Sequence, residues 1–160
     1  MKVFLNSIKG FSRAMYGMAG IALTFIIALT VCDVILRYFR RPITGTFELV
    51  AFTGAIVIGF AIPLTSWVRG HIFVDFFILK LPKKIRDAFN VTTRLMGIGL
   101  FFLAGWNLIK VGMDLKKSGE VSLTLQLPFY PVAYGIGIAC FVQCLVLVCD
   151  IMKIFGGEYE

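Results

Sequence analysis

Charged side chains are scarce in this chain of 160 residues: they make up 16% of it, against about 25% in an average soluble domain. Apolar residues (AVILMFWYC) account for 59%, and the mean hydropathy is +0.89. A chain with so few polar groups cannot cover its surface in water. The composition therefore excludes an ordinary soluble domain and predicts an integral membrane protein.

The residues that build common catalytic and metal centres are also few. His71 is the single histidine, so it cannot supply two haem ligands, and no zinc-ligand spacing occurs. The cysteines form no C-x-x-C pair and lie within apolar runs, where packing is favoured over thiol exchange. We therefore expect no cofactor, no metal site and no catalytic residue. The cysteines are Cys32, Cys140, Cys144 and Cys149.

The charge balance is +7, from 16 Lys and Arg against 9 Asp and Glu. The basic residues lie between the apolar runs, where they suit the anionic head groups of lipids. No basic stripe interleaved with stacking aromatic residues appears outside these runs. The pattern favours contact with membrane lipids over nucleic-acid binding.

Four long runs contain no charged residue, and a helix needs about 20 apolar residues to cross the hydrocarbon of a bilayer. The third run is short, but Arg94 and Lys110 can extend it by reaching toward the interface. The fourth run is too long for one span and divides near Pro128 and Pro131. Open sheet edges are excluded in hydrocarbon, and the runs lack the alternation of barrel strands. We expect an all-α membrane domain over residues 1–160, with spans at about 14–36, 49–68, 92–113 and 132–150.

Two further segments, at about 1–13 and 71–81, are predicted to be amphipathic and interfacial. The alternative for residues 71–81 is a loop whose apolar face packs against the bundle. Lys and Arg are unevenly distributed: the N-terminal arm, middle connection and tail together hold 10, and the other two connections hold 6. The positive-inside rule then predicts that both termini are cytoplasmic.

Ionisable residues are nearly absent from the predicted spans. Asp33 is the one acid within a predicted helix, and Arg37 lies four residues later on the same face, which favours a local ion pair. A transporter that carries its own substrate usually has polar groups or broken helices near the middle of the membrane. We therefore expect this chain to work by packing against a partner.

Several short motifs occur in a specific order: one closes the first span, one opens the second, and two follow the second. Together with the four spans, they resemble the small permease subunit (the Q, or DctQ-like, subunit) of tripartite ATP-independent periplasmic (TRAP) transporters. Many members have two adjacent acids at the start of the second span, whereas here Phe47 precedes a lone Glu48. The motifs are Arg37-Tyr38-Phe39, Glu48-Leu49, Arg69-Gly70-His71-Ile72 with Val74-Asp75, and Leu81-Pro82.

The resemblance implies a multi-pass protein of the bacterial inner membrane that acts with two partners. A large multi-span permease subunit would move substrate by an elevator-like motion coupled to sodium. A soluble periplasmic protein would capture an organic anion, such as a C4-dicarboxylate or sialic acid. The small subunit would enlarge the static scaffold of the large one and offer part of a docking surface to the periplasmic protein.

Several residues are candidates for docking or structural roles at the periplasmic mouth. Arg37 and Glu48 are expected to pair with each other or to bind the partner subunits. Arg40 and Arg41 are expected to meet an acidic patch on the periplasmic protein, or otherwise lipid phosphate or solvent.

Three more candidates belong to the predicted inner surface. Gly70 would allow a turn with positive φ, and His71 would anchor that turn through its ring nitrogens. Asp75 is expected to pair with Lys80 or Arg69.

Two other functional classes compete with the scaffold. One is a membrane thiol or quinone redox enzyme that uses the cysteines. The other is a stand-alone, small proton-coupled exchanger with Asp33 as its proton carrier.

Overall fold

The computed structural model describes residues 2–68 and 83–155, and these residues form four long α-helices. Their only β pairing is a single antiparallel bridge between Val121 and Pro128 in a connection. The described part of the chain is therefore all-α, as the sequence predicts. The helices are α1 (Lys2–Tyr38), α2 (Thr46–Trp67), α4 (Lys83–Ser118) and α5 (Tyr130–Phe155).

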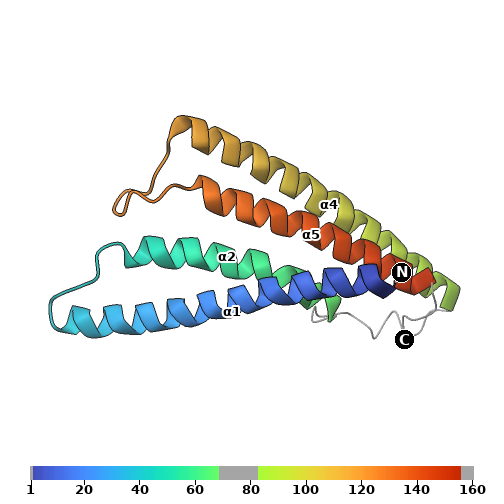
Figure 1. Ribbon diagram of the computed structural model, residues 1–160, viewed down its shortest axis with the longest axis horizontal. Coiled ribbons are helices and arrows are strands. Elements are labelled where there is room, and N and C mark those ends of the chain that lie inside the picture. Colours follow the sequence, from blue (N-terminus) through green and yellow to red (C-terminus); the bar gives the residue numbers. More distant parts are fainter. Residues whose placement is uncertain (1, 69–82, 156–160) are drawn as a thin grey trace.

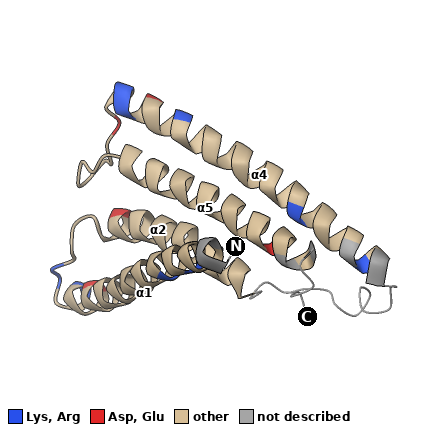
Figure 2. Cartoon of the chain, turned by 45° about the vertical axis from the view of Figure 1, so that its right-hand side comes forward, with Lys and Arg blue, Asp and Glu red and all other residues tan. Residues whose placement is uncertain are grey.

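Each helix contains a stretch long and apolar enough to span a membrane. Lys, Arg, Asp and Glu lie mainly toward the helix ends, and the middles of α2 and α5 carry none (Figure 2). The chain is a multi-pass membrane protein. The stretches are Leu5–Tyr38, Thr46–Trp67, Ala88–Ser118 and Tyr130–Met152.

The helices form two antiparallel hairpins, α1 with α2 and α4 with α5 (Figure 1). The hairpins join where α2 packs along α5 and where the first part of α1 meets α5. They lie close together at the end that carries the N-terminus and diverge toward the opposite end (Figure 1). Packing of the helices alone therefore leaves the diverging end weakly joined.

The N-terminal part of α1 belongs to the bundle. Residues 2–13, which the sequence suggests as a separate interfacial segment, continue the helix of the first span without a break. Ile8 is buried with Val146 and Cys149 of α5, because it lies on the inward-facing stripe of α1. Contact of the opposite face with lipid head groups stays a prediction. The other expected interfacial segment, residues 71–81, lies outside the described residues.

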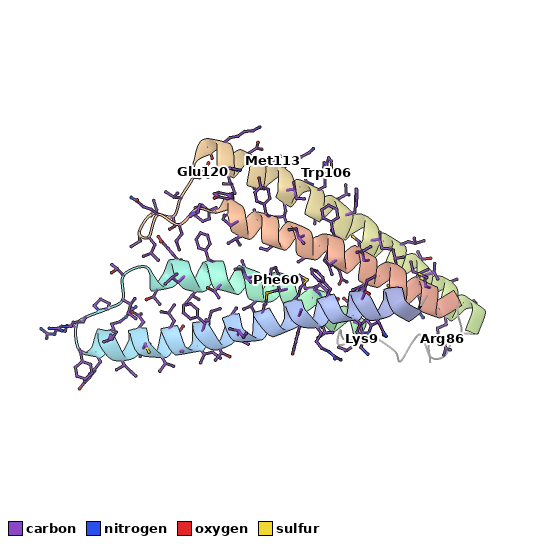
Figure 3. All side chains as sticks on the ribbon, viewed as in Figure 1. Lys9, Phe60, Arg86, Trp106, Met113 and Glu120 are labelled. Carbon is purple, nitrogen blue, oxygen red and sulfur yellow. The ribbon has the colours of Figure 1, made fainter. Side chains whose placement is uncertain are left out.

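The next turns of α1 bury a second cluster against α5. Met15 packs with Ala139 and Val142, and Phe60 of α2 lies against them (Figure 3). These contacts link three helices through apolar side chains. They fix α1 across α5 at the end where the hairpins are close.

Glycine lets α4 and α5 approach each other closely. A Cβ atom added at Gly105 would lie 3.2 Å from the carbonyl oxygen of Gly137, and one at Gly137 would lie 3.4 Å from the carbonyl oxygen of Gly105. Small residues at such a crossing allow backbone-to-backbone contact inside a membrane. The α4–α5 hairpin is accordingly closely packed at this crossing.

Pro63 lies within α2, and the helix continues through it. Proline has no backbone N–H, so the carbonyl of Gly59 loses the donor that it would have one turn later. Both residues are buried against the rest of the bundle. The missing backbone hydrogen bond therefore lies where α2 packs against α5.

Candidate functional site

Two connections meet at the end where the hairpins diverge (Figure 1). We call residues 39–45, between α1 and α2, the first loop, and residues 119–129, between α4 and α5, the second loop. We call this part of the molecule the loop end. It holds the described residues that the sequence suggests for docking, namely Arg37, Arg40, Arg41 and Glu48.

Asp33 holds the first loop in place. One of its carboxylate oxygens, Oδ2, lies 2.6 Å from Arg37 Nη2, which confirms the predicted ion pair. The other, Oδ1, accepts a hydrogen bond of 2.9 Å from the backbone N–H of Ile43. Asp33 is buried, whereas the side chain of Arg37 is 70% exposed. With both oxygens engaged by protein groups, this carboxylate serves as a local tie.

Glu48 binds the second loop. Its Oε2 accepts hydrogen bonds from Ser122 Oγ at 2.7 Å and from the N–H of Leu125 at 2.9 Å. Its Oε1 accepts one from the N–H of Thr124 at 2.7 Å. The expected pairing of Glu48 with Arg37 does not form, because Arg37 pairs with Asp33 on its own helix. One carboxylate thus ties the start of α2 to a loop more than 70 residues away.

The second loop is also closed by its own hydrogen bonds, centred on Ser122. The N–H of Ser122 donates to the carbonyl of Leu127 at 2.9 Å, and the N–H of Gln126 donates to the carbonyl of Ser122 at 3.1 Å. Ser122 Oγ also accepts a hydrogen bond of 3.1 Å from the N–H of Leu127. Gln126 has a φ of 53°, a left-handed conformation that closes the turn. The second loop therefore has a defined shape.

Apolar contacts join the two loops beside Glu48. The side chain of Leu125 covers Gly45, and a Cβ atom at Gly45 would lie 2.6 Å from Leu125 Cδ1. Gly45 also has a φ of 82°, which an L-residue with a side chain rarely adopts. One turn further along α2, the ring of Phe52 stacks on that of Phe129 with centroids 5.0 Å apart. These contacts close the gap between the hairpins at the loop end.

The outer surface of the loop end is basic and partly apolar. Arg40 and Arg41 are exposed, whereas Asp33 and Glu48 are engaged in hydrogen bonds within the chain. Leu123 projects from the second loop with 99% of its surface exposed. No sequence pattern marks Leu123, because it lies in the part of the fourth charge-free run that precedes the predicted span at 132–150.

A second polar contact lies between α2 and α5, nearer the other end. Gln143 Nε2 donates a hydrogen bond of 2.7 Å to Ser66 Oγ, and both residues are buried. Sequence reasoning missed this contact as well, since Gln143 lies within a charge-free run. Gly70, His71 and Asp75, the other candidate residues, lie outside the described residues.

Three features of the described residues bear on metal, cofactor or substrate binding. No group of three or more His, Cys, Asp or Glu among residues 2–68 and 83–155 could hold a metal ion. All four cysteines are free thiols. A cavity between α2, α4 and α5, lined in part by Gly59, Phe101 and Gln143, has a volume of about 20 Å³. It has room for about one water molecule, far less than the roughly 300–1,000 Å³ of a typical ligand pocket.

Comparison with protein families gives a match over most of the chain. The model for "Tripartite ATP-independent periplasmic transporters, DctQ component" matches residues 26–157. The chain belongs to the DctQ family. The DctQ match includes both loops and the residues that join them, from Asp33 to Phe129. No curated protein and no solved structure matches this DctQ chain.

Proposed function

We propose that this DctQ chain is the non-catalytic small subunit of a sodium-coupled TRAP transporter for organic anions, and a static scaffold for the large permease subunit. Family membership is the observation that carries this proposal. It is supported by the few ionisable side chains within the spans and by the small volume of the cavity described above.

The exposed apolar faces of α1 and α4 support a lateral partner. Ile21 on α1 and Met96 on α4 are 75% and 71% exposed, and other large apolar side chains follow along both helices. Trp106 and Met113 are likewise exposed on α4 (Figure 3). Such faces suit either lipid or the helices of a larger membrane subunit. The proposal assigns part of this surface to the large subunit and the rest to lipid.

The loop end would form part of the docking surface for the periplasmic substrate-binding protein. Arg40 and Arg41 would meet carboxylates on that protein, with Arg37 close by on the last turn of α1. Glu48 would act indirectly, by holding the second loop in the docking position. This assignment places the loop end in the periplasm and both termini in the cytoplasm of a cell with an inner membrane.

The other candidate residues would act at the cytoplasmic surface. Gly70 would form a turn with positive φ, anchored by His71, and Asp75 would pair with Lys80 or Arg69. The substrate would be set by the partner chains, with C4-dicarboxylates and sialic acid as the leading classes.

Affinity purification from mild detergent, followed by reconstitution into liposomes, tests the scaffold proposal. We expect a multi-span companion to copurify with the chain. Uptake should require that companion, the soluble binding protein and an inward sodium gradient. Robust uptake by the chain alone, or its isolation only as a homo-oligomer, would contradict the proposal.

A further inference from the structure

Leu123 is the most exposed large apolar side chain of the described residues, at 99%. Its immediate neighbours in the chain, Ser122 and Thr124, are polar, whereas Val121 and Leu125, two residues away on either side, are 44% and 36% exposed. A large apolar side chain that is fully exposed at the tip of a shaped loop is available to fill an apolar pocket of a partner protein.

The position of Leu123 is fixed from both sides by the same carboxylate. Ser122, immediately before it, donates through Oγ to Glu48, and Thr124, immediately after it, donates through its N–H. The contacts of Ser122 with Leu127 close the turn behind it. A backbone held in this way loses little conformational freedom when the Leu123 side chain binds, which favours affinity.

The charge beside Leu123 indicates the chemistry of its partner. Leu125 packs on Gly45, so the second loop lies against the first loop, which exposes Arg40 and Arg41. Of the acids at the loop end, Asp33 and Glu48 accept hydrogen bonds within the chain, whereas Glu120, at the start of the second loop, is exposed. The exposed surface is therefore apolar at Leu123 and net positive, with Arg40 and Arg41 against Glu120. The complementary surface is an apolar recess edged by carboxylates.

We propose that Leu123 is the apolar anchor of the docking surface, and that it inserts into a carboxylate-rimmed apolar recess on the soluble substrate-binding protein. The proposal rests on the function proposed above and assigns to it a residue and a geometry. In it, Glu48 is a positioning residue that aims Leu123, while Arg40 and Arg41 face the rim of the recess.

Affinity measurements with purified components test the anchor. The complex of this chain with its large subunit is placed in nanodiscs, and its binding to the purified soluble protein is titrated. We expect Leu123→Ala to weaken binding by about tenfold or more, as truncation of an anchor does. Ile58→Ala is the matched control: Ile58 is 68% exposed on α2, away from both loops, and binding should stay within about twofold. An affinity within twofold of wild type for Leu123→Ala as well would overturn the proposal.

Substitution with a larger side chain separates a protein recess from lipid. Leu123→Trp should strengthen any partition into the membrane interface but overfill a recess shaped for leucine. We expect it to weaken binding of the soluble protein by severalfold. Unchanged or tighter binding would assign Leu123 to lipid and overturn the proposal.

Photocrosslinking identifies the occupant directly. The four native cysteines are replaced by alanine, and Leu123→Cys is labelled with a maleimide photocrosslinker in the assembled complex. An adduct with the added soluble protein supports the proposal, whereas adducts only with lipid or with a second copy of this chain overturn it.

The function and the anchor fail in distinguishable ways. If the wild-type complex transports substrate without the soluble protein, the docking function itself is wrong. If transport needs that protein and Leu123→Ala and Leu123→Trp leave its affinity unchanged, only the anchor is wrong.

Discussion

Glu48 Oε2 accepts a hydrogen bond of 2.7 Å from Ser122 Oγ, and this contact joins the two helical hairpins at the end where their helices diverge. At the other end, Ser66 and Gln143 make a buried hydrogen bond between the same hairpins. Polar ties thus supplement the apolar packing at two levels of the bundle. In a membrane, a scaffold gains rigidity from such contacts because apolar helix surfaces associate with lipid and with each other almost equally well.

Loss of the Glu48 carboxylate should release the second loop. Glu48→Ala leaves the N–H groups of Thr124 and Leu125 without their acceptor, so we expect their amide exchange to speed up by about tenfold or more. Hydrogen–deuterium exchange of the chain in nanodiscs measures this. Glu120→Ala is the control, because Glu120 is exposed in the same loop and should leave exchange unchanged. Equal exchange rates for these amides in Glu48→Ala and wild type would show that the Glu48 carboxylate does not hold the second loop.

Mutation should separate the two contacts of Asp33, which are the ion pair with Arg37 and the hydrogen bond from the Ile43 N–H. Arg37→Ala removes only the partly exposed ion pair, whereas Asp33→Ala also removes the acceptor of the Ile43 N–H. We expect Asp33→Ala to increase exchange of the Ile43 amide more than Arg37→Ala does, since exposed ion pairs contribute little. Asp33→Asn keeps an acceptor oxygen and should keep sodium-driven uptake by the complex. Loss of uptake in Asp33→Asn with the complex still assembled would instead support a proton carrier.

The buried pair between α2 and α5 should show a measurable coupling energy. Ser66→Ala and Gln143→Leu, alone and together, form a double-mutant cycle for the 2.7 Å hydrogen bond. Side-chain hydrogen bonds within membranes average about 0.6 kcal/mol and reach about 1.7 kcal/mol, so we expect a coupling in that range. The free energy of unfolding by steric trapping measures it. Thr65→Ala replaces Ser66→Ala in a control cycle, because Thr65 Oγ1 donates to Ala61 within α2, and that cycle should show no coupling.

Because α4 and α5 approach each other closely at Gly105, we expect substitution to be far less tolerated there than at Gly99. A Cβ at Gly105 would lie 3.2 Å from both the Gly137 carbonyl oxygen and Cys140 Cβ, whereas one at Gly99 meets nothing within 4 Å. We expect Gly105→Ala to lower the free energy of unfolding by about 1–3 kcal/mol through overpacking. Gly99→Ala should be neutral or slightly stabilising, because alanine has the higher helix propensity. Thermal denaturation in detergent compares the two variants. Equal melting temperatures would contradict a close contact between α4 and α5 at Gly105.

Local patterns in the sequence predict the parts of this fold that depend on nearby residues. Charge-free runs predict the four helices, and the spacing of Asp33 and Arg37 predicts their ion pair because both lie on one helix face. The contact of Glu48 with Ser122 could not be predicted in this way, since it depends on how distant helices pack. Nor does any pattern mark the exposure of Leu123, which arises from the shape of its loop.

Charge reversal of the first loop tests the electrostatic part of docking. Arg40→Glu with Arg41→Glu should slow uptake at limiting concentrations of the soluble protein, because charges at the rim of an interface mainly change the association rate. The wild-type rate should fall as salt rises and approach that of the variant, since screening weakens attraction between exposed charges. Lys116→Glu with Lys117→Glu is the matched control: it reverses two exposed charges at the end of α4 and should slow uptake less. The membrane complex should stay assembled in both variants. Unchanged uptake after reversal of Arg40 and Arg41 would exclude them from the interface and leave lipid phosphate or solvent as their partner.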